Sequence, residues 1–388
     1  MEKNVILCVD DEPIILKSLK KELAGHFAES MLIETAESGD EGLEVIDFLK
    51  SRGKNITIII SDYIMPQMRG DRFLIEAHKH LPNAMKILLT GEASIEGVTN
   101  VINKIDLYRY ISKPWKKADF IMTIESAIEK YNRDKTIKTQ RKKITDSINY
   151  AERIQSAILP SSDYLNKLLP NHFVFYKPKD IVSGDFYWCR EIEGKIIIAL
   201  ADCKGHGVAG AFMSLIGNQL LNRATIEKKI YSPEKILESM NSVIGEVLTS
   251  KQKKGESGME VAVCVIDKEE SKVSFAGAKR PICIIENENL IYIEGDKTAI
   301  DGKESITYTK QEFDLKPNTQ IYLFSDGYQD QLGEKENKPF TSQNLKSLYQ
   351  TISEVTPKEQ LEKLENTFES WKGKEEQIDD VLVLGIKI

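Results

Sequence analysis

Short apolar runs and helix-like patterns alternate over the first 122 residues. The runs lie at Val5–Val9, Leu32–Thr35, Ile56–Ile60, Lys86–Thr90 and Leu107–Ile111, and Ile56–Ile60 is continuous in β-branched residues. Helical spacing of apolar residues follows Pro13, and a second helical pattern covers Gly39–Leu49. Strands that alternate with helices are typical of a doubly wound parallel sheet, so we expect an α/β domain over residues 1–122.

The pattern changes after Pro160, where short strands predominate. We expect strands at Phe173–Lys177, Phe186–Cys189, Lys195–Ala201, Met259–Asp267, Lys272–Ala276, Ile282–Ile285, Leu290–Ile293, Gln320–Ser325 and Asp380–Lys387. Helical patterns cover Ala209–Thr225, Pro233–Leu248, Ser342–Ile352 and Pro357–Trp371. Many strands of antiparallel length with separate helices predict an α+β domain over residues 161–388, with two sheets covered by helices.

Residues 123–160, between these two patterns, predict one long helix that continues the last helix of the first domain. The stretch has no glycine, and Pro160 is its only proline. Apolar or small residues recur every seven positions, at Ile137, Ile144, Ala151 and Ile158. A narrow apolar seam on so long a helix needs a partner helix, which favours a parallel homodimer joined by a coiled coil. The alternative is an ordinary amphipathic helix that lies on its own domain.

Composition indicates a globular protein of two or three domains. The 388 residues are 41% hydrophobic and 29% charged, with a formal net charge of −7. No strongly basic domain is present, which argues against a nucleic acid partner, and we interpret the basic stretch Lys130–Arg153 as the solvated face of the long helix. The five cysteines include no C-x-x-C pair, and no apolar stretch approaches 18 residues. We therefore expect a cytoplasmic protein with free thiols and no membrane span.

Polar residues follow the predicted strand ends of the first domain, at Asp10, Asp11, Asp62, Thr90 and Lys113. The carboxyl ends of parallel strands meet at one edge of such a sheet, so we expect these side chains to converge. Crowded carboxylates favour Mg²⁺, and a carboxylate is also able to accept a phosphoryl group. The ammonium and hydroxyl groups suit phosphoryl oxygens. Taken singly, the aspartates also fit helix caps, and the Lys-Pro pair also fits a plain turn.

These residues resemble the CheY-like receiver domain of two-component response regulators. The matching motifs are Asp10-Asp11, D-Y-I-M-P at Asp62–Pro66, Gly70, T-G at Thr90-Gly91 and K-P at Lys113-Pro114. The resemblance implies a (βα)5 fold that is phosphorylated by a sensor histidine kinase. It implies Asp62 as phosphoacceptor, Mg²⁺ bound by Asp10, Asp11 and Asp62, and a switch set of Thr90, Tyr110 and Lys113.

Four acidic sites punctuate the second domain, at Asp185, Asp202, Asp326 and the pair Asp379-Asp380. Three of them lie at the edge of a strongly apolar strand, where ionised carboxylates are costly unless a cation compensates them. Two cations held between such carboxylates would activate a water and offset charge on a phosphoryl group. The alternative is a set of unrelated turn aspartates, because S-D-G alone is a common turn.

This second set resembles the metal-dependent protein serine/threonine phosphatases, the PPM superfamily, and within it the SpoIIE/RsbU-like branch. The motifs are S-G-D-F-Y-W, A-D-C-K-G-H-G-V-A-G-A-F-M-S, F-A-G-A, F-S-D-G and D-D-V-L-V. The resemblance implies an αββα sandwich with two Mn²⁺ or Mg²⁺ ions. It implies a catalytic and metal-binding set of Asp185, Asp202, Asp326 and Asp379, assisted by the carbonyl of Cys203. The phosphate-binding arginine of larger relatives has no counterpart before Val182, which leaves Lys279 and Arg280 as substitutes, and His206 is either a general acid or a helix-start residue.

The two resemblances together predict a response regulator in which phosphorylation of Asp62 controls a phosphatase. The substrate class is a phosphoserine or phosphothreonine protein, and the family suggests an anti-sigma-factor antagonist. The alternative is an adaptor, in which an inactive phosphatase-like domain sequesters a partner protein. The intact set of aspartates favours the enzyme, since an adaptor has no need of buried carboxylates.

Overall fold

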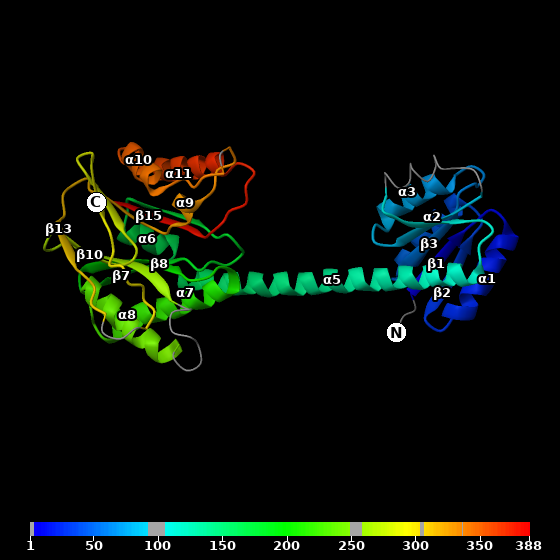
Figure 1. Cartoon of the computed structure of the whole chain (residues 1–388), viewed down its shortest axis with the longest axis horizontal. Helices are drawn as coiled ribbons and strands as arrows, with labels where there is room; N and C mark the ends of the chain where they lie inside the picture. The colour runs from blue at the N-terminus through cyan, green and yellow to red at the C-terminus, as the bar shows by residue number, and fades with distance from the viewer. Residues whose placement is uncertain (1–3, 92–104, 249–257, 303–305, 336) are drawn as a thin grey trace. The chain divides into compact units, whose positions relative to one another are not determined.

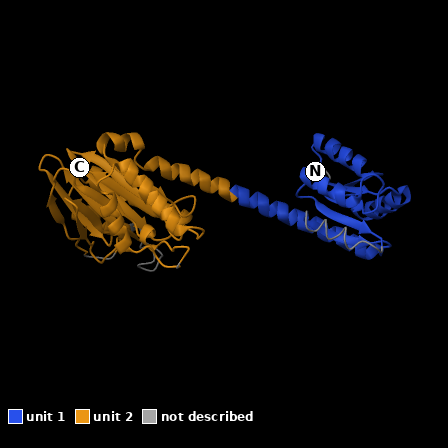
Figure 2. Ribbon diagram, turned by 90° about the horizontal axis from the view of Figure 1, so that it is seen from above, with its two compact units in different colours: residues 1–143 blue, residues 144–388 orange. Residues whose placement is uncertain are grey.

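The computed structural model describes residues 4–91, 105–248, 258–302, 306–335 and 337–388 (Figure 1). The chain divides into two compact units, residues 1–143 and 144–388, which Figure 2 shows in different colours. Each unit has its own sheets and its own apolar cores.

A five-stranded parallel sheet forms the centre of the first unit, with the strand order β2-β1-β3-β4-β5. Its strands are β1 (Asn4–Val9), β2 (Met31–Ala36), β3 (Ile56–Asp62), β4 (Met85–Thr90) and β5 (Leu107–Ser112). The described helices are α1 (Pro13–Phe27), α2 (Gly39–Ser51), α3 (Gly70–His80) and the first part of α5 (Lys117–Ile158). The doubly wound α/β sheet predicted from the sequence is confirmed.

Alternate residues of β1 face opposite sides of this sheet. Ile6 and Cys8 belong to the core under α1 and α5, whereas Val5, Leu7 and Val9 belong to the core under α2 and α3. All five side chains are fully buried. Helices on both faces therefore explain why the strand is continuously apolar rather than alternating.

Two antiparallel five-stranded sheets form the second unit, with the orders β13-β10-β9-β8-β7 and β12-β11-β14-β15-β6. The first sheet contains β7 (Phe186–Ile192), β8 (Lys195–Cys203), β9 (Met259–Asp267), β10 (Lys272–Ala278) and β13 (Gln311–Asp314). The second contains β6 (His172–Lys177), β11 (Ile282–Glu286), β12 (Asn289–Ile293), β14 (Gln320–Phe324) and β15 (Val381–Lys387). The helices are α6 (Ser162–Leu168), α7 (Gly207–Asn222) with the π-helical turn η1 (Arg223–Glu227), α8 (Pro233–Leu248), α9 (Gly327–Asp330), α10 (Ser342–Ile352) and α11 (Pro357–Lys372).

Three apolar layers hold this unit together. The middle layer lies between the two sheets and includes Ile198 of β8. A second layer, with Trp188 and Met240, lies between the first sheet and the helices α7 and α8. The third lies under α10 and α11, where the rings of Tyr322 and Tyr349 stack with centroids 4.3 Å apart. The unit is thus an αββα sandwich, and Figure 1 shows α10 and α11 beside β15.

Helix α5 is one uninterrupted helix of 42 residues that begins in the first unit and ends in the second. Its first turns bury Phe120, Ile124 and Tyr131 in the core under α1. Every side chain from residue 132 to residue 147 is exposed. The helix ends two residues before Pro160, consistent with the poor fit of a pre-proline residue to a helix. The continuous helix predicted from the sequence is confirmed.

All five cysteines are buried and unpaired. Burial raises the pKa of the thiols of Cys8, Cys189, Cys264 and Cys283 to about 12. These residues act as small hydrophobes in the cores. None of the helices in the described ranges is both long and apolar enough to cross a bilayer.

Candidate functional site

Three of the residues predicted to converge in the first unit do so. Asp10 follows β1, Asp62 is the last residue of β3, and Lys113 follows β5. The Lys113 Nζ lies 2.8 Å from Asp10 Oδ2 and 2.5 Å from Asp62 Oδ1. Asp10 is fully buried, and Asp11 beside it is half-buried. The geometry places two carboxylates and one ammonium at the carboxyl edge of the sheet.

The protonation of this group is set by burial and by the ion pairs. Burial raises the pKa of the Asp62 carboxyl, Lys113 opposes the rise, and the charge of Asp10 adds to it. The Ile64 N–H also donates to Asp62 Oδ2 at 3.0 Å. For Lys113, burial acts to lower the pKa of the ammonium, but the two carboxylates outweigh it and the net shift is upward. Lys113 therefore stays charged beside Asp62.

The proposed switch residues differ in exposure. Thr90 ends β4 and is buried, and its carbonyl accepts a hydrogen bond from the Lys113 N–H at 2.7 Å. Tyr110 lies on β5 opposite Leu88, and its side chain is 54% exposed. Thr90 is thus tied to the lysine turn, whereas Tyr110 lies at the surface.

In the second unit, strand pairing brings the acidic sites together. Asp202 is near the end of β8, and Asp185 directly precedes β7, which pairs with β8. Asp326 follows β14 by two residues, and Asp379 precedes β15, which pairs with β14. Burial raises the pKa of the Asp202 carboxyl, and the charges of Asp326 and Asp379 add to the rise. We call Asp185, Asp202, Asp326 and Asp379 the carboxylate cluster.

Arg280 lies inside this cluster. A single nitrogen, Nη2, is 2.9 Å from Asp202 Oδ2, 2.6 Å from Asp326 Oδ2 and 2.6 Å from Glu260 Oε2. Glu260 lies on β9 directly opposite Asp202. The Arg280 side chain is only 8% exposed. One positive charge therefore faces three carboxylates at contact distance.

The single positive charge of Arg280 does not balance the four carboxylates of the cluster. Burial raises the pKa of the Asp185 carboxyl, and the charge of Asp202 adds to the rise. Burial likewise raises the pKa of Asp202 despite Arg280. For Asp326, burial acts in the same direction, but Arg280 outweighs it and the pKa falls. Asp185 Oδ2 is buried without a hydrogen-bond partner.

Hard oxygen ligands with uncompensated charge fit Mg²⁺ or Mn²⁺. Within the described ranges, no three His, Cys, Asp or Glu side chains already stand as a set that would hold a metal. The Arg280 guanidinium contacts both Asp202 and Asp326. The carboxylate oxygens are therefore of the type that these cations bind, and Arg280 contacts two of the carboxylates that would serve as ligands.

A tightly packed loop presents Asp185. The two carboxylate oxygens of Asp380 accept hydrogen bonds from the backbone N–H groups of Lys179, at 2.8 Å, and Gly184, at 2.7 Å. A Cβ atom on Gly184 would lie 2.6 Å from the carbonyl oxygen of Gly205, so a side chain there would force the two loops apart. The Asp380 carboxylate thus anchors the loop, and glycine at position 184 allows it to pack closely against the turn after Cys203.

The two remaining candidates near this turn have distinct settings. Cys203 ends β8 and is buried, and burial raises the pKa of its thiol further than its neighbouring carboxylates do. His206 is the N-cap residue of α7, and its Nδ1 lies 2.9 Å from Asp180 Oδ2 at the exposed surface. His206 is therefore paired outside the carboxylate cluster, as expected of a helix-start histidine.

Two contributors were not singled out from the sequence. Glu260 holds Arg280, and Gln155 of α5 is buried against the loop before Asp185. Asp380 was named only as the neighbour of Asp379, and the structure shows that it anchors this loop. A glutamine among the apolar residues at the end of α5 was the one available signal, because a polar side chain in an apolar seam needs a partner.

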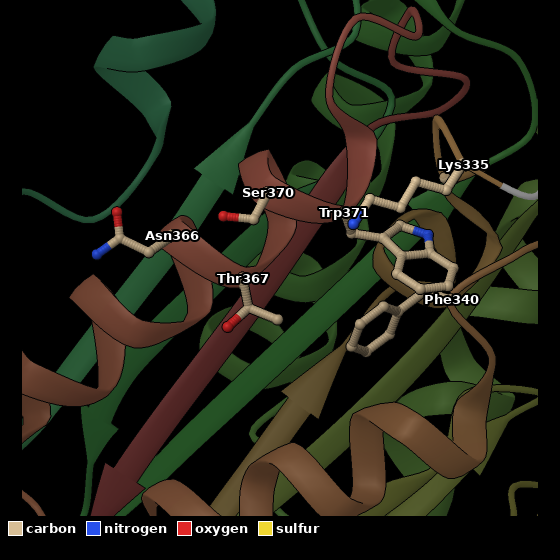
Figure 3. Close-up of a pocket in the computed structure, with 7 residues that line it drawn as sticks. Lys335, Phe340, Asn366, Thr367, Ser370 and Trp371 are labelled. Carbon is tan, nitrogen blue, oxygen red and sulfur yellow. The ribbon is translucent and has the colours of Figure 1, made fainter.

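A separate hollow of about 480 Å³ lies beside α11. Figure 3 shows its lining, which comes from α11 and from the loop after α9: Gly333, Lys335, Phe340, Asn366, Thr367, Ser370 and Trp371. None of these residues belongs to the carboxylate cluster. The hollow therefore adds no group to the chemistry described above.

Comparisons with known proteins agree with both units. The family model of Stage II sporulation protein E (SpoIIE) matches residues 192–388, and that of the response regulator receiver domain matches residues 6–125. Among solved structures, the SiaA-PP2C domain of Pseudomonas aeruginosa is 30% identical with a TM-score of 0.60, over 64% of this chain and 98% of that chain.

Curated relatives match a smaller part. The hydrogenase transcriptional regulatory protein HoxA of Cupriavidus necator is 28% identical over 128 residues, which is 33% of this chain and 25% of HoxA. HoxA of Bradyrhizobium diazoefficiens is 26% identical over 137 residues, 35% of this chain and 26% of HoxA. The chain spans about a quarter of the length of these relatives.

The SpoIIE match covers half of the chain and includes three members of the carboxylate cluster, while the receiver match covers the Asp10, Asp62 and Lys113 group. The same order is seen in the fold, where a parallel sheet is followed by a long helix and an αββα sandwich. The chain therefore belongs to the SpoIIE family, with a receiver domain fused to a PP2C-type phosphatase domain.

Proposed function

We propose that this chain hydrolyses phosphoserine or phosphothreonine in a partner protein, and that phosphorylation of Asp62 controls the activity. The carboxylate cluster carries the proposal. One guanidinium nitrogen faces three carboxylates there, and a buried oxygen of Asp185 has no hydrogen-bond partner. Such a cluster is costly without further positive charge, and two divalent cations would supply it. A regulatory phosphoprotein such as an anti-sigma-factor antagonist is the substrate class we favour.

We assign two Mn²⁺ or Mg²⁺ ions to the side chains of Asp185, Asp202, Asp326 and Asp379 and to the carbonyl of Cys203. When bound, these ions would supply an activated water and offset charge on the phosphoryl group. Asp380 has a different task, because both of its carboxylate oxygens already accept hydrogen bonds from backbone N–H groups. It orients the loop that carries Asp185.

In the receiver domain we assign the phosphoacceptor role to Asp62 and the phosphodonor role to a sensor histidine kinase. The proposed Mg²⁺ ligands are Asp10, Asp11 and Asp62. Lys113 already contacts Asp62 Oδ1 at 2.5 Å, so its ammonium is in place for a phosphoryl oxygen. Thr90 and Tyr110 are the residues we expect to respond to phosphorylation.

We further propose that α5 pairs with α5 of a second copy of this chain. Ile137, Ile144 and Ile154 are 41%, 60% and 45% exposed, although they are large and apolar. The seven-residue spacing of Ile137 and Ile144 continues to Ala151, as a coiled-coil seam requires. A homodimer would cover these side chains.

The test is hydrolysis of p-nitrophenyl phosphate by the full-length chain with and without Mn²⁺. We expect Mn²⁺-dependent turnover that falls about 100-fold or more in Asp202→Asn and in Asp326→Asn, because each removes a proposed ligand. The matched control is Asp163→Asn, which changes an exposed aspartate of α6. Near-parent turnover of either variant at saturating Mn²⁺ contradicts the metal assignment. A parent chain that binds Mn²⁺ without hydrolysis favours the adaptor.

A further inference from the structure

Arg280 occupies a fixed position in a tight turn. It follows Lys279 between β10 and β11, and Lys279 has a left-handed backbone with φ of 64°. The Lys279 N–H donates to the carbonyl of Asp296 at 2.8 Å, which holds the turn. Because the backbone is fixed there, the long side chain of Arg280 has a defined origin from which it reaches the carboxylate cluster.

The guanidinium of Arg280 is only partly used. All three carboxylate contacts go to Nη2, and the buried Nε has no hydrogen-bond partner. A guanidinium carries five N–H donors in a planar fork, which matches two oxygens of a phosphate at once. The residue as a whole is 6% exposed, so an unpaired donor there is costly unless a ligand uses it.

Glu260 keeps this arginine at the site independently of the cluster. Its Oε2 contacts Arg280 Nη2 at 2.6 Å, and its Oε1 accepts from Lys279 Nζ at 2.9 Å. Glu260 is not among the ligands that we assign to the metal ions. With Asp202 and Asp326 as ligands of the cations, Glu260 would remain as the partner that holds Arg280 beside them.

We propose that Arg280 is the phosphate-binding cation of this chain and that Glu260 is its positioning residue. This inference rests on the proposed function. In the metal-free chain the guanidinium neutralises part of the cluster, and in the metal-loaded chain its fork binds the oxygens of a dianionic phosphate monoester.

The proposal predicts two effects of opposite sign. Removing the guanidinium removes a competitor of the cations for Asp202 and Asp326, so Mn²⁺ should bind at least as tightly as in the parent. The same change removes a bidentate partner of phosphate, so phosphate should bind more weakly. A residue that only supported the fold would weaken both.

The experiment uses the full-length chain and compares Arg280→Gln, Arg280→Lys and the parent. Titration calorimetry with Mn²⁺ alone measures metal affinity. Inhibition by inorganic phosphate at saturating Mn²⁺, together with KM and kcat for p-nitrophenyl phosphate, measures phosphate contact. We expect phosphate inhibition to weaken about tenfold or more in Arg280→Gln, the size of one charge-assisted hydrogen bond, with unchanged or tighter Mn²⁺ binding. Arg280→Lys should lose less, because it keeps the charge but not the fork.

Lys268→Gln is the control, because it changes an exposed lysine directly after β9 that has no assigned role in the site. It should behave as the parent in both assays. The inference is overturned if phosphate inhibition is unchanged in Arg280→Gln, or if Mn²⁺ and phosphate binding are lost in parallel. The proposed function still stands in that case if the parent hydrolyses p-nitrophenyl phosphate in a Mn²⁺-dependent way. If Arg280→Gln loses its far-ultraviolet circular dichroism signal, Arg280→Lys decides by the same criteria. A parent that neither binds Mn²⁺ nor hydrolyses overturns both.

Discussion

Gln155 and Ser183 are joined by two hydrogen bonds that use both backbone groups of the serine. The Gln155 Nε2 donates to the Ser183 carbonyl at 2.6 Å, and its Oε1 accepts from the Ser183 N–H at 3.0 Å. The same Nε2 donates to Ser214 Oγ of α7 at 2.8 Å. Because Ser183 lies two residues before Asp185, one side chain of α5 connects the long helix to a member of the carboxylate cluster.

Replacing Gln155 with alanine should loosen that loop. The change leaves the buried N–H and carbonyl of Ser183 without partners, and each unsatisfied group costs about 1–3 kcal/mol. We expect a lower melting temperature of the second unit and an Mn²⁺ affinity reduced about tenfold. Differential scanning calorimetry and Mn²⁺ titration check the two effects. Gln140→Ala, an exposed glutamine on the same helix, is the control, and equal Mn²⁺ affinity in the two variants would count against the connection.

Phosphorylation of the receiver should depend on Asp62. Incubation with acetyl phosphate and Mg²⁺ should add one phosphoryl mass to the parent, because Asp62 is a carboxylate with an ammonium at 2.5 Å. Asp62→Asn should remain unmodified, whereas Asp47→Asn, at the surface of α2, should be labelled like the parent. Intact-protein mass spectrometry distinguishes these outcomes. Labelling of Asp62→Asn to the level of the parent is incompatible with the assignment.

The metal-free chain should be stabilised by Asp185→Asn, and the gain should depend on pH. The folded-state pKa of the Asp185 carboxyl lies above its unfolded value, chiefly because of burial. Its contribution to stability is fully present below the unfolded pKa, about 3.9, and is lost as pH rises through the folded pKa. The difference between variant and parent should therefore be small near pH 4 and grow toward neutral pH.

Thermal unfolding in EDTA across this pH range provides the measurement. Removing an unpaired buried charge should raise the free energy of unfolding by about 1–3 kcal/mol. In a unit of this size, each kcal/mol raises the melting temperature by about 2–4 °C. Asp163→Asn, exposed on α6, should show no such trend. A gain that is flat with pH, or largest in acid, contradicts burial of the charge as the cause.

Inserting two glycines after Lys143 should abolish the response of the phosphatase domain to receiver phosphorylation without abolishing its basal activity. The insertion interrupts α5 where its side chains are exposed and leaves both packed ends in place. Glycine costs about 1 kcal/mol per residue in a helix, and the insertion also shifts the seven-residue seam. We expect basal p-nitrophenyl phosphate turnover within about twofold of the parent and no response to receiver phosphorylation.

The control for this prediction is the same insertion after Asn287, in the exposed turn between β11 and β12. That protein should keep its response to phosphorylation. Sedimentation at micromolar concentration should report a dimer in the parent. A response that survives the insertion after Lys143, or a parent that is monomeric in both phosphorylation states, excludes the proposed role of α5.

Local pattern was sufficient for most of the fold. Strands buried on both faces are continuously apolar, so β1 and β3 could be predicted from the sequence. The edge strand β13 and the short helix α6 were not predicted, since β13 is largely exposed and α6 buries only Leu165 and Leu168. Short elements with few buried residues give no clear periodicity.

The candidate site likewise contains some contacts that local sequence pattern predicts and others that it does not. Strand-end position sufficed to bring Asp10, Asp62 and Lys113 together, because parallel strands end at one edge. The contact of Arg280 with Asp326, by contrast, joins residues 46 positions apart, one between β10 and β11 and the other after β14. No local period encodes such a pairing, so the sequence offered the arginine only as one of two substitutes for a missing group.

The exposed middle of α5 has a thermodynamic consequence. From residue 132 to residue 147 the helix is held by its own backbone hydrogen bonds, while the packed turns at either end supply the nucleus. An unpacked helix of this length is marginal in water, so in a single chain this segment is the part of α5 that opens at the lowest free energy. Pairing would raise that free energy, so helix formation and association become one equilibrium. An unfolded segment cannot transmit a conformational change from the receiver to the phosphatase domain. The protein concentration, which sets the fraction of dimer, would therefore also set whether the two domains are coupled.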